Sequence, residues 1–409
     1  MALDAERVKK DFPILDRQVD GHRLVYLDSA ASAQKPMAVL DAMERFYETT
    51  YANIHRGVYR IAEEATARYE DARAKLARFI GARSPAELIF TKNVTEAINL
   101  VAYAWARTNL RPGDTILLTE MEHHANLVPW LQLSAERGVD LRYLPIDDEG
   151  LLVLDGLDRA LDGVKLVGVT SVSNVLGTIN PLRRIADAAH AAGALVLVDA
   201  AQHAPHLPID VAAIDCDFLG FTGHKMVGPT GIGCLWGREA LLDAMPPFLG
   251  GGEMIRDVRL DGFTPNELPW KFEAGTMPIA EAIGLGAAVD YLEAIGLDAI
   301  RAHERALTAY AMRSLADRYG DDITIFGPRD LDQRSGVLSF AYKGIHPHDL
   351  SQVLDESAVC IRAGHHCAKP LMRRLGVAAT ARASLYLYND EADVDALADA
   401  LALADRLFA

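Results

Sequence analysis

Two residues, Asp199 and Lys225, follow separate apolar runs and could together serve Schiff-base chemistry. Asp199 ends the run Ala194–Asp199, and a carboxylate at the end of a buried strand needs a cationic partner, such as a protonated heterocyclic nitrogen, to offset its desolvation. Lys225 lies in the polar, Gly-rich loop Phe221–Pro229. A lysine attacks carbonyl groups once desolvation or a neighbouring cation lowers its pKa. Taken alone, Lys225 is more simply a surface residue, because lysine is almost never buried unless paired.

The segment Thr91–Glu96 has the composition of a helix start that could bind a phosphate. It follows the apolar run Leu88–Thr91. The apolar residues after it have the spacing of one helix face: Ile98, Val101, Ala102 and Trp105. Free backbone N–H groups at a helix start, together with the Thr95 hydroxyl, could hold an anion without any basic residue. The alternative is that Thr95 only caps the helix.

Cys367 lies in the stretch Arg362–Pro370, whose residues could activate a thiol. A thiol attacks as its thiolate, and neighbouring cations lower the pKa of a cysteine below about 8.5. Three nearby residues are possible cations: His365, His366 and Lys369. A metal site on the adjacent His-His-Cys residues is the weaker alternative, because three neighbours cannot readily converge on one tetrahedral ion. The other cysteines lie in or beside apolar runs and are predicted to be small buried hydrophobes: Cys216, Cys234 and Cys360.

These residues must be positioned by secondary structure, and the chain alternates β-rich runs with helical patterns. Strands are predicted over Leu88–Thr91, Thr115–Thr119, Lys165–Thr170, Ala194–Asp199, Asp217–Phe221 and Gly231–Trp236. One intervening helix is bounded by Pro181, which suits its first position, and Gly193, which can end it. The alternation predicts βαβ units around a mostly parallel sheet, and hence an α/β fold class. Ligands of such sheets bind outside the carboxyl ends of the strands, where Asp199 falls.

Towards the C-terminal end, the regular alternation of predicted strands and helices is lost. A long helical stretch is predicted through Ala282–Leu315, followed by a strand over Gly336–Phe340, a helix near Asp349–Glu356 and a strand over Val359–Arg362. Mixed elements of this kind predict a smaller α+β domain. The stretch Phe248–Pro269, rich in Gly, Pro and Asp, is predicted to be a long excursion that is either functional or disordered. We expect an N-terminal segment over residues 1–24 that packs with the small domain, a large domain over 25–295 and the small domain over 296–409.

Composition narrows the function classes. The 409 residues carry 41 Lys+Arg against 57 Asp+Glu, and this formal charge of −16 argues against nucleic acid as the main ligand. No apolar run approaches the roughly 20 residues that span a bilayer, and the acidic start is unlike a signal peptide, so we expect a cytoplasmic protein without a membrane segment. Four cysteines without a CxxC pair fit a reducing compartment.

In combination, these segments resemble the fold-type I pyridoxal-phosphate (PLP) enzymes, and among them the aminotransferase class V family. The order of the motifs carries the resemblance: Thr95 at a helix start, His123-His124 after a strand, Asp199 with Gln202, and Thr222-Gly223-His224-Lys225. Further segments are similar to those of group II cysteine desulfurases of the SufS type: Leu27–Ser32, Asn53–Gly57, Ser173–Gly177, Arg362–Pro370 and Ala381–Tyr386. The resemblance spans nearly the whole chain. It implies a large domain with a mostly parallel seven-stranded sheet, plus a smaller α+β C-terminal domain that carries Cys367.

The resemblance implies a role for each cofactor residue. Lys225 would bind PLP as a Schiff base, Asp199 would keep the pyridine nitrogen protonated, and Gln202 would hydrogen-bond the phenolic oxygen. His123 would stack on the ring and move protons at the substrate thiol. The residues implied at the phosphate are Thr95, Thr222, His224 and Thr276 of the partner subunit. Asn174 would lie beside the cofactor, and no metal is implied.

The implied activity is that of a PLP-dependent cysteine desulfurase. Asn174 and Arg382 would bind the carboxylate of L-cysteine, and Cys367 would take the sulfur as a persulfide while L-alanine leaves. A homodimer is expected, with active sites at its interface and a sulfur acceptor of the SufE or SufU type that serves iron-sulfur cluster assembly. Only residues 362–369 separate Ile361 from Pro370, so we expect a short loop that shields the persulfide.

Three alternative functions stay open. A selenocysteine lyase, or a relative active on cysteine sulfinate, would use the same cofactor site. A kynureninase-like hydrolase is weaker, because it would give no role to Cys367. Outside enzymes, a non-catalytic sulfur carrier or scaffold could keep the fold for interaction alone, although the presence of Lys225, Asp199 and His123 argues against it.

Overall fold

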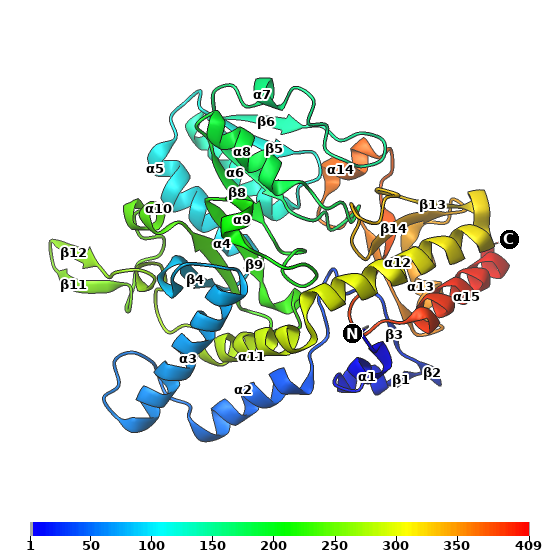
Figure 1. The fold of residues 1–409 in the computed structure, drawn as a ribbon, viewed down its shortest axis with the longest axis horizontal. Coiled ribbons are helices and arrows are strands. Elements are labelled where there is room, and N and C mark those ends of the chain that lie inside the picture. Colours follow the sequence, from blue (N-terminus) through cyan, green and yellow to red (C-terminus); the bar gives the residue numbers. More distant parts are fainter. Residues whose placement is uncertain (1–2, 409) are drawn as a thin grey trace.

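A computed structural model describes residues 3–408, and a seven-stranded sheet forms its centre (Figure 1). The strands are β4 (Leu88–Thr91), β5 (Thr115–Thr119), β6 (Asp140–Leu144), β7 (Val164–Thr170), β8 (Leu195–Asp199), β9 (Phe218–Thr222) and β10 (Gly233–Gly237). Their order is β4-β10-β9-β8-β7-β5-β6; β10 is antiparallel to both neighbours and all other pairs are parallel. The predicted α/β class with a mostly parallel seven-stranded sheet is confirmed.

The sheet strands are apolar because both faces are covered. Every residue of β4, β5, β9 and β10 is buried, as continuous apolar runs predict. Helix α8 (Leu182–Ala191) begins directly after Pro181 and is followed by Gly193 in the left-handed conformation, at φ 78°, as predicted. The other α-helices in the chain segment from β4 to just beyond β10 are short or medium in length: α4 (Val94–Leu100), α5 (Arg107–Asn109), α6 (Val128–Arg137), α7 (Leu157–Ala160), α9 (Val211–Ile214) and α10 (Glu239–Ala244).

A second, four-stranded antiparallel sheet lies at the right of Figure 1. It contains β13 (Ile323–Ile325), β14 (Val337–Tyr342), β17 (Thr380–Ser384) and β16 (Arg362–Gly364), in that order. Helices α12 (Leu297–Tyr319), α13 (Pro347–Asp355) and α15 (Glu391–Phe408) enclose an apolar core with it. The short helix α14 (Lys369–Arg374) follows Cys367. The predicted domain limits at residues 24 and 295 stay a proposal.

Two predictions for this region are wrong in detail. The single strand predicted over Val359–Arg362 is two strands: β15 (Val359–Cys360) pairs with β3 (Val25–Tyr26), and β16 joins the four-stranded sheet. The single long helix is interrupted at Gly296 (φ 90°), which separates α11 (Ile279–Ile295) from α12. The physical reason is that a residue without a Cβ can leave helical φ at little cost.

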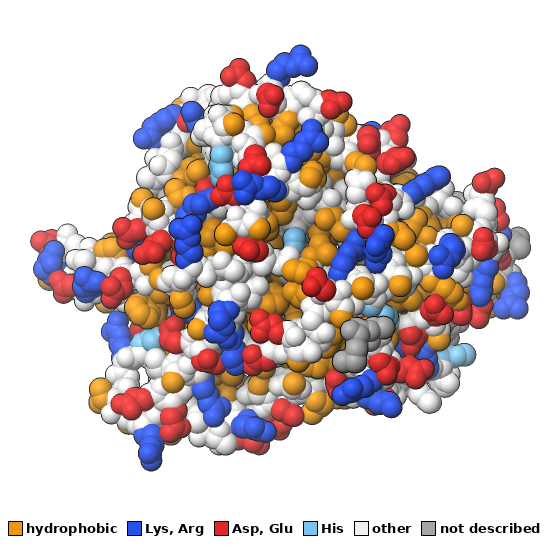
Figure 2. All heavy atoms as spheres, in the orientation of Figure 1, with side chains coloured by type: hydrophobic (Ala, Val, Ile, Leu, Met, Phe, Trp, Pro, Cys, Tyr) orange, Lys and Arg blue, Asp and Glu red, His pale blue; other side chains and the backbone are white. Residues whose placement is uncertain are grey.

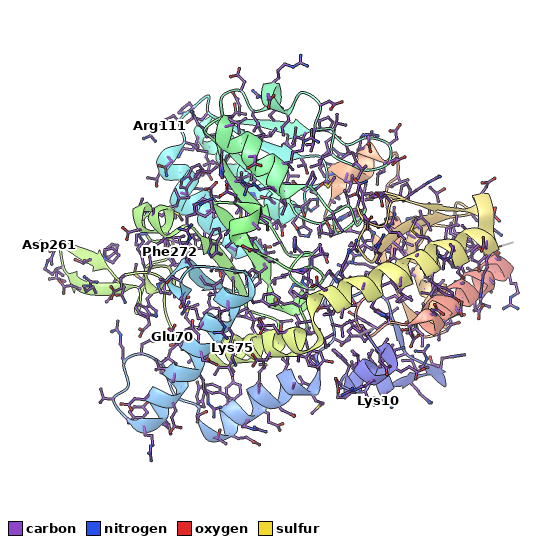
Figure 3. The ribbon with its side chains drawn as sticks, viewed as in Figure 1. Lys10, Glu70, Lys75, Arg111, Asp261 and Phe272 are labelled. Carbon is purple, nitrogen blue, oxygen red and sulfur yellow. The ribbon has the colours of Figure 1, made fainter. Side chains whose placement is uncertain are left out.

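Helices α2 (Met37–Thr49), α3 (Arg60–Phe79) and α11 form a layer below the large sheet in Figure 1. Lys75 of α3 reaches Asp290 of α11, with 2.8 Å between Nζ and Oδ2 (Figure 3). Near the N-terminus, α1 (Ala5–Lys9) and the hairpin of β1 (Gln18–Val19) and β2 (His22–Arg23) lie beside α15. Lys9 and Arg23 both contact Asp393 of α15, at 3.0 and 2.6 Å.

The predicted excursion over Phe248–Pro269 contains a hairpin of β11 (Ile255–Arg259) and β12 (Gly262–Pro265) that projects from the body. Asp261 marks its far end in Figure 3. Val258, Leu260 and Phe263 are exposed on it. Figure 2 shows acidic and basic side chains interspersed on the visible face of the molecule. Among residues 3–408, no helix is long and apolar enough to cross a membrane.

Candidate active site

A cavity of about 230 Å³ lies at the carboxyl ends of the parallel strands, and Arg362 and Arg382 of the four-stranded sheet line its other side. Eight of the predicted site residues line it: Thr95, His123, Asn174, Thr222, His224, Lys225, Cys367 and Arg382. They come from the start of α4, the segments after β5, β7 and β9, the residues beyond β16, and β17 itself. The sheet therefore brings together residues that are far apart in the sequence.

Lys225 ends the single turn η5 (Gly223–Lys225), which directly follows β9. Its side chain is only partly exposed and lines the cavity, so the surface alternative is wrong. Burial lowers the pKa of Lys225 to about 8, against an opposing effect of Asp199. A substantial fraction of the amine is thus neutral near pH 8, which is the form that attacks carbonyl groups.

Asp199 and Gln202 lie beneath the cavity, at the end of β8 and just beyond it. Burial raises the pKa of Asp199, while the N–H of Ala201 (3.0 Å to Oδ1) and the nearby Lys225 lower it. Gln202 donates from Nε2 to the carbonyl of Ala30 at 2.7 Å. Within residues 3–408, the buried Oε1 of Gln202 and the buried Oγ1 of Thr222 have no hydrogen-bond partner. Buried polar atoms are normally paired, so both are available to a bound group.

The start of α4 is capped by Asn93, whose Oδ1 accepts from the N–H of Glu96 at 3.0 Å. The alternative that Thr95 serves only as the cap is therefore wrong. Thr95 instead lines the cavity together with Thr222 and His224. The first N–H groups of a helix lack partners within the helix, so this corner presents N–H and hydroxyl donors to an anion.

His123 precedes the turn η4 (His124–Asn126), and its Nδ1 accepts from the N–H of Ala125 at 3.0 Å. This hydrogen bond places the proton of the neutral ring on Nε2. Burial, followed by the charge of Lys225, lowers the pKa of His123 to about 3. The His123 imidazole is therefore neutral at neutral pH, since a positive charge is costly in a buried pocket that already contains a cation.

Glu122, which the sequence analysis did not single out, braces this segment. Its carboxyl oxygens accept from the Thr119 hydroxyl (2.7 Å), the Thr170 N–H (2.9 Å) and Asn126 Nδ2 (2.8 Å). Burial raises the pKa of Glu122 to about 8, so the group is mostly protonated at neutral pH. Its position directly before His123 and three residues after the apolar run Thr115–Thr119 was a usable signal, because a carboxyl group beside a buried strand needs hydrogen-bond partners.

Cys367 is partly exposed to the cavity, in the left-handed conformation at φ 55°. Its N–H donates to Nδ1 of His365 at 3.1 Å. His366 does not act as the predicted cation, because burial and the charge of Arg382 lower its pKa to about 3. The buried cations whose charge couples to the thiol are Lys225 and Arg382. Cys216 and Cys234 are buried as predicted, whereas Cys360 is only half-buried.

Arg382 is the cationic side chain that β17 places in the cavity. Its guanidinium donates from Nη1 to the carbonyl of Asn174 and from Nη2 to Oδ1 of Asp28, both at 3.0 Å. Asp28 is a second residue that sequence reasoning did not assign, although it lies in a segment that carried the resemblance. The ion pair orients the guanidinium, and among the described residues its Nε has no partner.

Asp199, Gln202 and Thr276 are the predicted site residues that do not line this cavity, and of these Thr276 lines a different one. It lines a separate small cavity with His55 and Glu253. The segment before it is fixed by Glu273, which accepts from the buried Arg73 at 2.6 Å and from the N–H of Phe90 at 2.8 Å. This buried ion pair attaches the Thr276 segment to α3 and β4.

The family model described as aminotransferase class V matches residues 25–397. The chain belongs to the aminotransferase class V family. Family membership implies a PLP cofactor, and the two unpartnered buried atoms, the buried lysine and the donors at α4 fit such a group.

Within the aminotransferase class V family, this chain is similar to cysteine desulfurases. A probable cysteine desulfurase of Streptomyces coelicolor is 54% identical, with 98% of this chain and 96% of the relative covered. A cysteine desulfurase of Haloferax volcanii is 48% identical over 100% of this chain and 98% of the relative. The solved structure of the cysteine desulfurase CsdA from Escherichia coli superposes with a TM-score of 0.91, at 41% identity and full coverage of both chains. The chain is a cysteine desulfurase of this family.

Proposed function

We propose that this enzyme converts L-cysteine to L-alanine and leaves a persulfide on Cys367. The observation that carries the proposal is that the Cys367 thiol, the Lys225 amine and the Arg382 guanidinium line one cavity. The named activity of its relatives supports the same reaction. Bound PLP supplies an electron sink for the substrate carbon atoms.

The proposed cofactor contacts use the residues of the cavity floor. Lys225 would hold PLP covalently, Asp199 would pair with the pyridine nitrogen and Gln202 with the phenolic oxygen. Gln202 Nε2 already donates one hydrogen to Ala30, so its second hydrogen serves that contact. His123 would face the ring, with Asn174 beside it. The phosphate would take the donors of Thr95, Thr222 and His224.

The lowered pKa of Lys225 gives cofactor attachment a defined pH dependence. In the cofactor-free chain at fixed PLP, the rate of attachment trapped by borohydride should rise with pH and level off above about 8, because only the neutral amine attacks. Asp199→Asn should move the midpoint to lower pH, since Asp199 raises the pKa of Lys225. A rate that keeps rising to pH 10, as for an ordinary lysine of pKa 10.5, would contradict the assignment.

The proposed sulfur transfer needs no further oxidant, reductant or proton source, because its bonds, electrons and protons balance between L-cysteine and Cys367. The Cys367 thiolate forms an S–S bond to the substrate sulfur while the substrate Cβ–S bond breaks; the sulfur is oxidised to the persulfide level and the carbon is reduced. The proton released from the Cys367 thiol and the protons of the substrate account for those gained by alanine. The neutral His123 ring would present its Nε2 hydrogen at this position as a hydrogen-bond donor to the substrate sulfur.

Arg382 and Asn174 would bind the substrate carboxylate. Arg382→Lys keeps the charge but loses the planar pair of donors and the contacts to Asp28 and Asn174. We expect the KM for L-cysteine to rise about tenfold or more with a smaller change in kcat, because a bidentate contact is lost in the ground state and transition state alike. Steady-state alanine formation measures this. A KM equal to that of wild type would remove Arg382 from the substrate site.

The active enzyme is proposed to be a homodimer. Thr276 lies in a separate cavity, and the exposed side chains near that end of the molecule include Tyr51, Val58 and Tyr59. Contact between two copies there would cover this apolar surface and bring Thr276 of the partner subunit to the cofactor phosphate. The projecting hairpin of β11 and β12 would reach over the partner's cavity. Sedimentation of the PLP-loaded enzyme tests this assembly.

The short loop around Cys367 predicts that sulfur release needs a protein acceptor. We expect slow turnover with cysteine and a small thiol reductant, and a gain of at least about tenfold on adding an acceptor of the SufE or SufU type, whose reactive cysteine can approach the shielded persulfide. Acceptors of that type would link the enzyme to iron-sulfur cluster assembly. Alanine formation with and without acceptor, repeated with selenocysteine as substrate, is the test. A full rate with the reductant alone would contradict the shielded persulfide.

A further inference from the structure

The backbone at Cys367 has a conformation that residues with a Cβ rarely adopt. His366 and Cys367 are consecutive and both left-handed, at φ 50° and 55°. Two such residues in succession persist only if surrounding contacts hold them. On the His366 side, Asn174 Nδ2 donates to the His366 carbonyl at 2.7 Å, and the His366 ring donates from Nε2 to the carbonyl of Thr380 at 3.1 Å.

On the Cys367 side, two hydrogen bonds come from a single residue, His124. Its N–H donates to the carbonyl of Cys367 at 2.7 Å, and its ring Nε2 accepts from the N–H of Lys369 at 3.1 Å. We call this pair of bonds the His124 clasp. Lys369 is the first residue of α14, so the His124 ring fills the place of a helix-capping side chain from 245 positions away in the sequence.

We propose that His124 is a positioning residue that holds the Cys367 thiol at a fixed place relative to His123. This inference rests on the proposed function of Cys367. His123 and His124 are adjacent in the chain, so the segment that carries the His123 imidazole also holds the backbone of the nucleophile. His123 and Cys367 line the same cavity, so the clasp would set how the thiol approaches a substrate sulfur bound there.

Neighbouring contacts support the clasp without replacing it. The apolar residues after Cys367 pack against the large-domain side in one buried cluster: Ala368, Leu371 and Met372 with Met121, Val175 and Leu176. This packing fixes the position of α14. It does not include His366 or Cys367, so the backbone of the turn is held by the hydrogen bonds. Nε2 must be unprotonated to accept from Lys369, and burial, with the charges of His365 and Lys369, lowers the pKa of His124.

Two matched pairs of variants isolate the ring contact. The amide oxygen of Gln is as many bonds from Cβ as Nε2 of His is by its shorter path. The amide oxygen of Asn is one bond closer to Cβ, so it does not reach the Lys369 N–H. His124→Gln therefore keeps the acceptor and His124→Asn removes it, while both keep the backbone bond to Cys367. In the second pair, Lys369→Pro removes the N–H donor at a helix position that tolerates proline, and Lys369→Ala keeps it.

Two readouts are measured on the PLP-loaded enzyme: persulfide formation on Cys367 in a single turnover, and alkylation of Cys367 by iodoacetamide, with the half-buried Cys360 as internal reference. We expect His124→Asn to slow persulfide formation about tenfold relative to His124→Gln, with the KM for cysteine within about twofold. Alkylation of Cys367 should become several-fold faster in the Asn variant. The Lys369→Pro variant should differ from Lys369→Ala in the same directions, which keeps the test valid if His124→Asn does not fold.

The outcomes distinguish a failure of the His124 clasp from a failure of the proposed function. Equal rates of persulfide formation and alkylation within both pairs would overturn the clasp and leave the proposed function standing. A wild-type enzyme that forms alanine but carries no persulfide on Cys367 would overturn the proposed function itself. A difference within each pair, with rescue by Gln, supports the positioning role.

Discussion

The Lys225→Ala variant is expected to lose alanine formation by at least about 10³-fold while keeping its fold. The amine is the nucleophilic group in the cavity with a pKa lowered to about 8, and no other lysine lines that cavity among the described residues. The variant should also lose the absorbance of covalently held PLP. Visible spectra, borohydride labelling followed by peptide mapping, and steady-state assays measure the two effects.

Lys35 provides a matched control. Burial also lowers the pKa of Lys35 to about 8, but its ammonium group contacts the carbonyl of His224 from outside the cavity lining. Lys35→Ala should keep the borohydride label at residue 225. Labelling that disappears in the Lys35 variant and persists in the Lys225 variant would show that the wrong lysine has been assigned.

The Cys367→Ser variant is expected to bind L-cysteine normally and to transfer no sulfur. A serine hydroxyl is not ionised at neutral pH and is a far poorer nucleophile than a thiolate, so we expect acceptor charging to fall by about 10³-fold or more. Arg382 and Asn174, the residues proposed to bind the substrate carboxylate, lie on other elements and keep their hydrogen bond to each other. Mass spectrometry of the acceptor and substrate-induced spectral changes of the enzyme measure transfer and binding separately.

Cys360→Ser is the control for this substitution. Cys360 is in β15, and burial raises the pKa of its thiol, so it is a poor source of thiolate. That variant should charge the acceptor at close to the wild-type rate. Sulfur on the acceptor after reaction with the Cys367→Ser enzyme would contradict the assigned nucleophile.

Within the large sheet, the sequence predicts the strands that read as continuous apolar runs and misses the edge strand that does not. Runs such as Leu88–Thr91 and Thr115–Thr119 coincide with β4 and β5, because a fully covered strand must be apolar throughout. The edge strand β6 contains exposed Asp140 and Tyr143, so no continuous apolar run marks it. The hairpin of β11 and β12 was missed for the same reason, since its charged residues are exposed.

At the site, residue types were predictable and their electrostatics were not. Motif order located Lys225 and Cys367 because both chemistries need particular side chains. The pKa of His123 depends instead on burial and on Lys225, and the orientation of Arg382 depends on Asp28. These neighbours are distant in the sequence, and only the fold specifies which of them meet.

The strand order also constrains how the chain can be completed during synthesis. β4 lies at the sheet edge, and its one strand neighbour is β10, which begins at Gly233. From the end of β4 at Thr91, 233 − 91 = 142 further positions must be translated before that neighbour exists, which takes roughly 7–28 s at the usual rates of translation. During this interval β4 and the start of α4 emerge from the ribosome without their partner strand. The corner of the cavity at the start of α4 therefore forms late, after the parallel strands β5 to β9 have been made, and the apolar β4 segment stays exposed to chaperones until then.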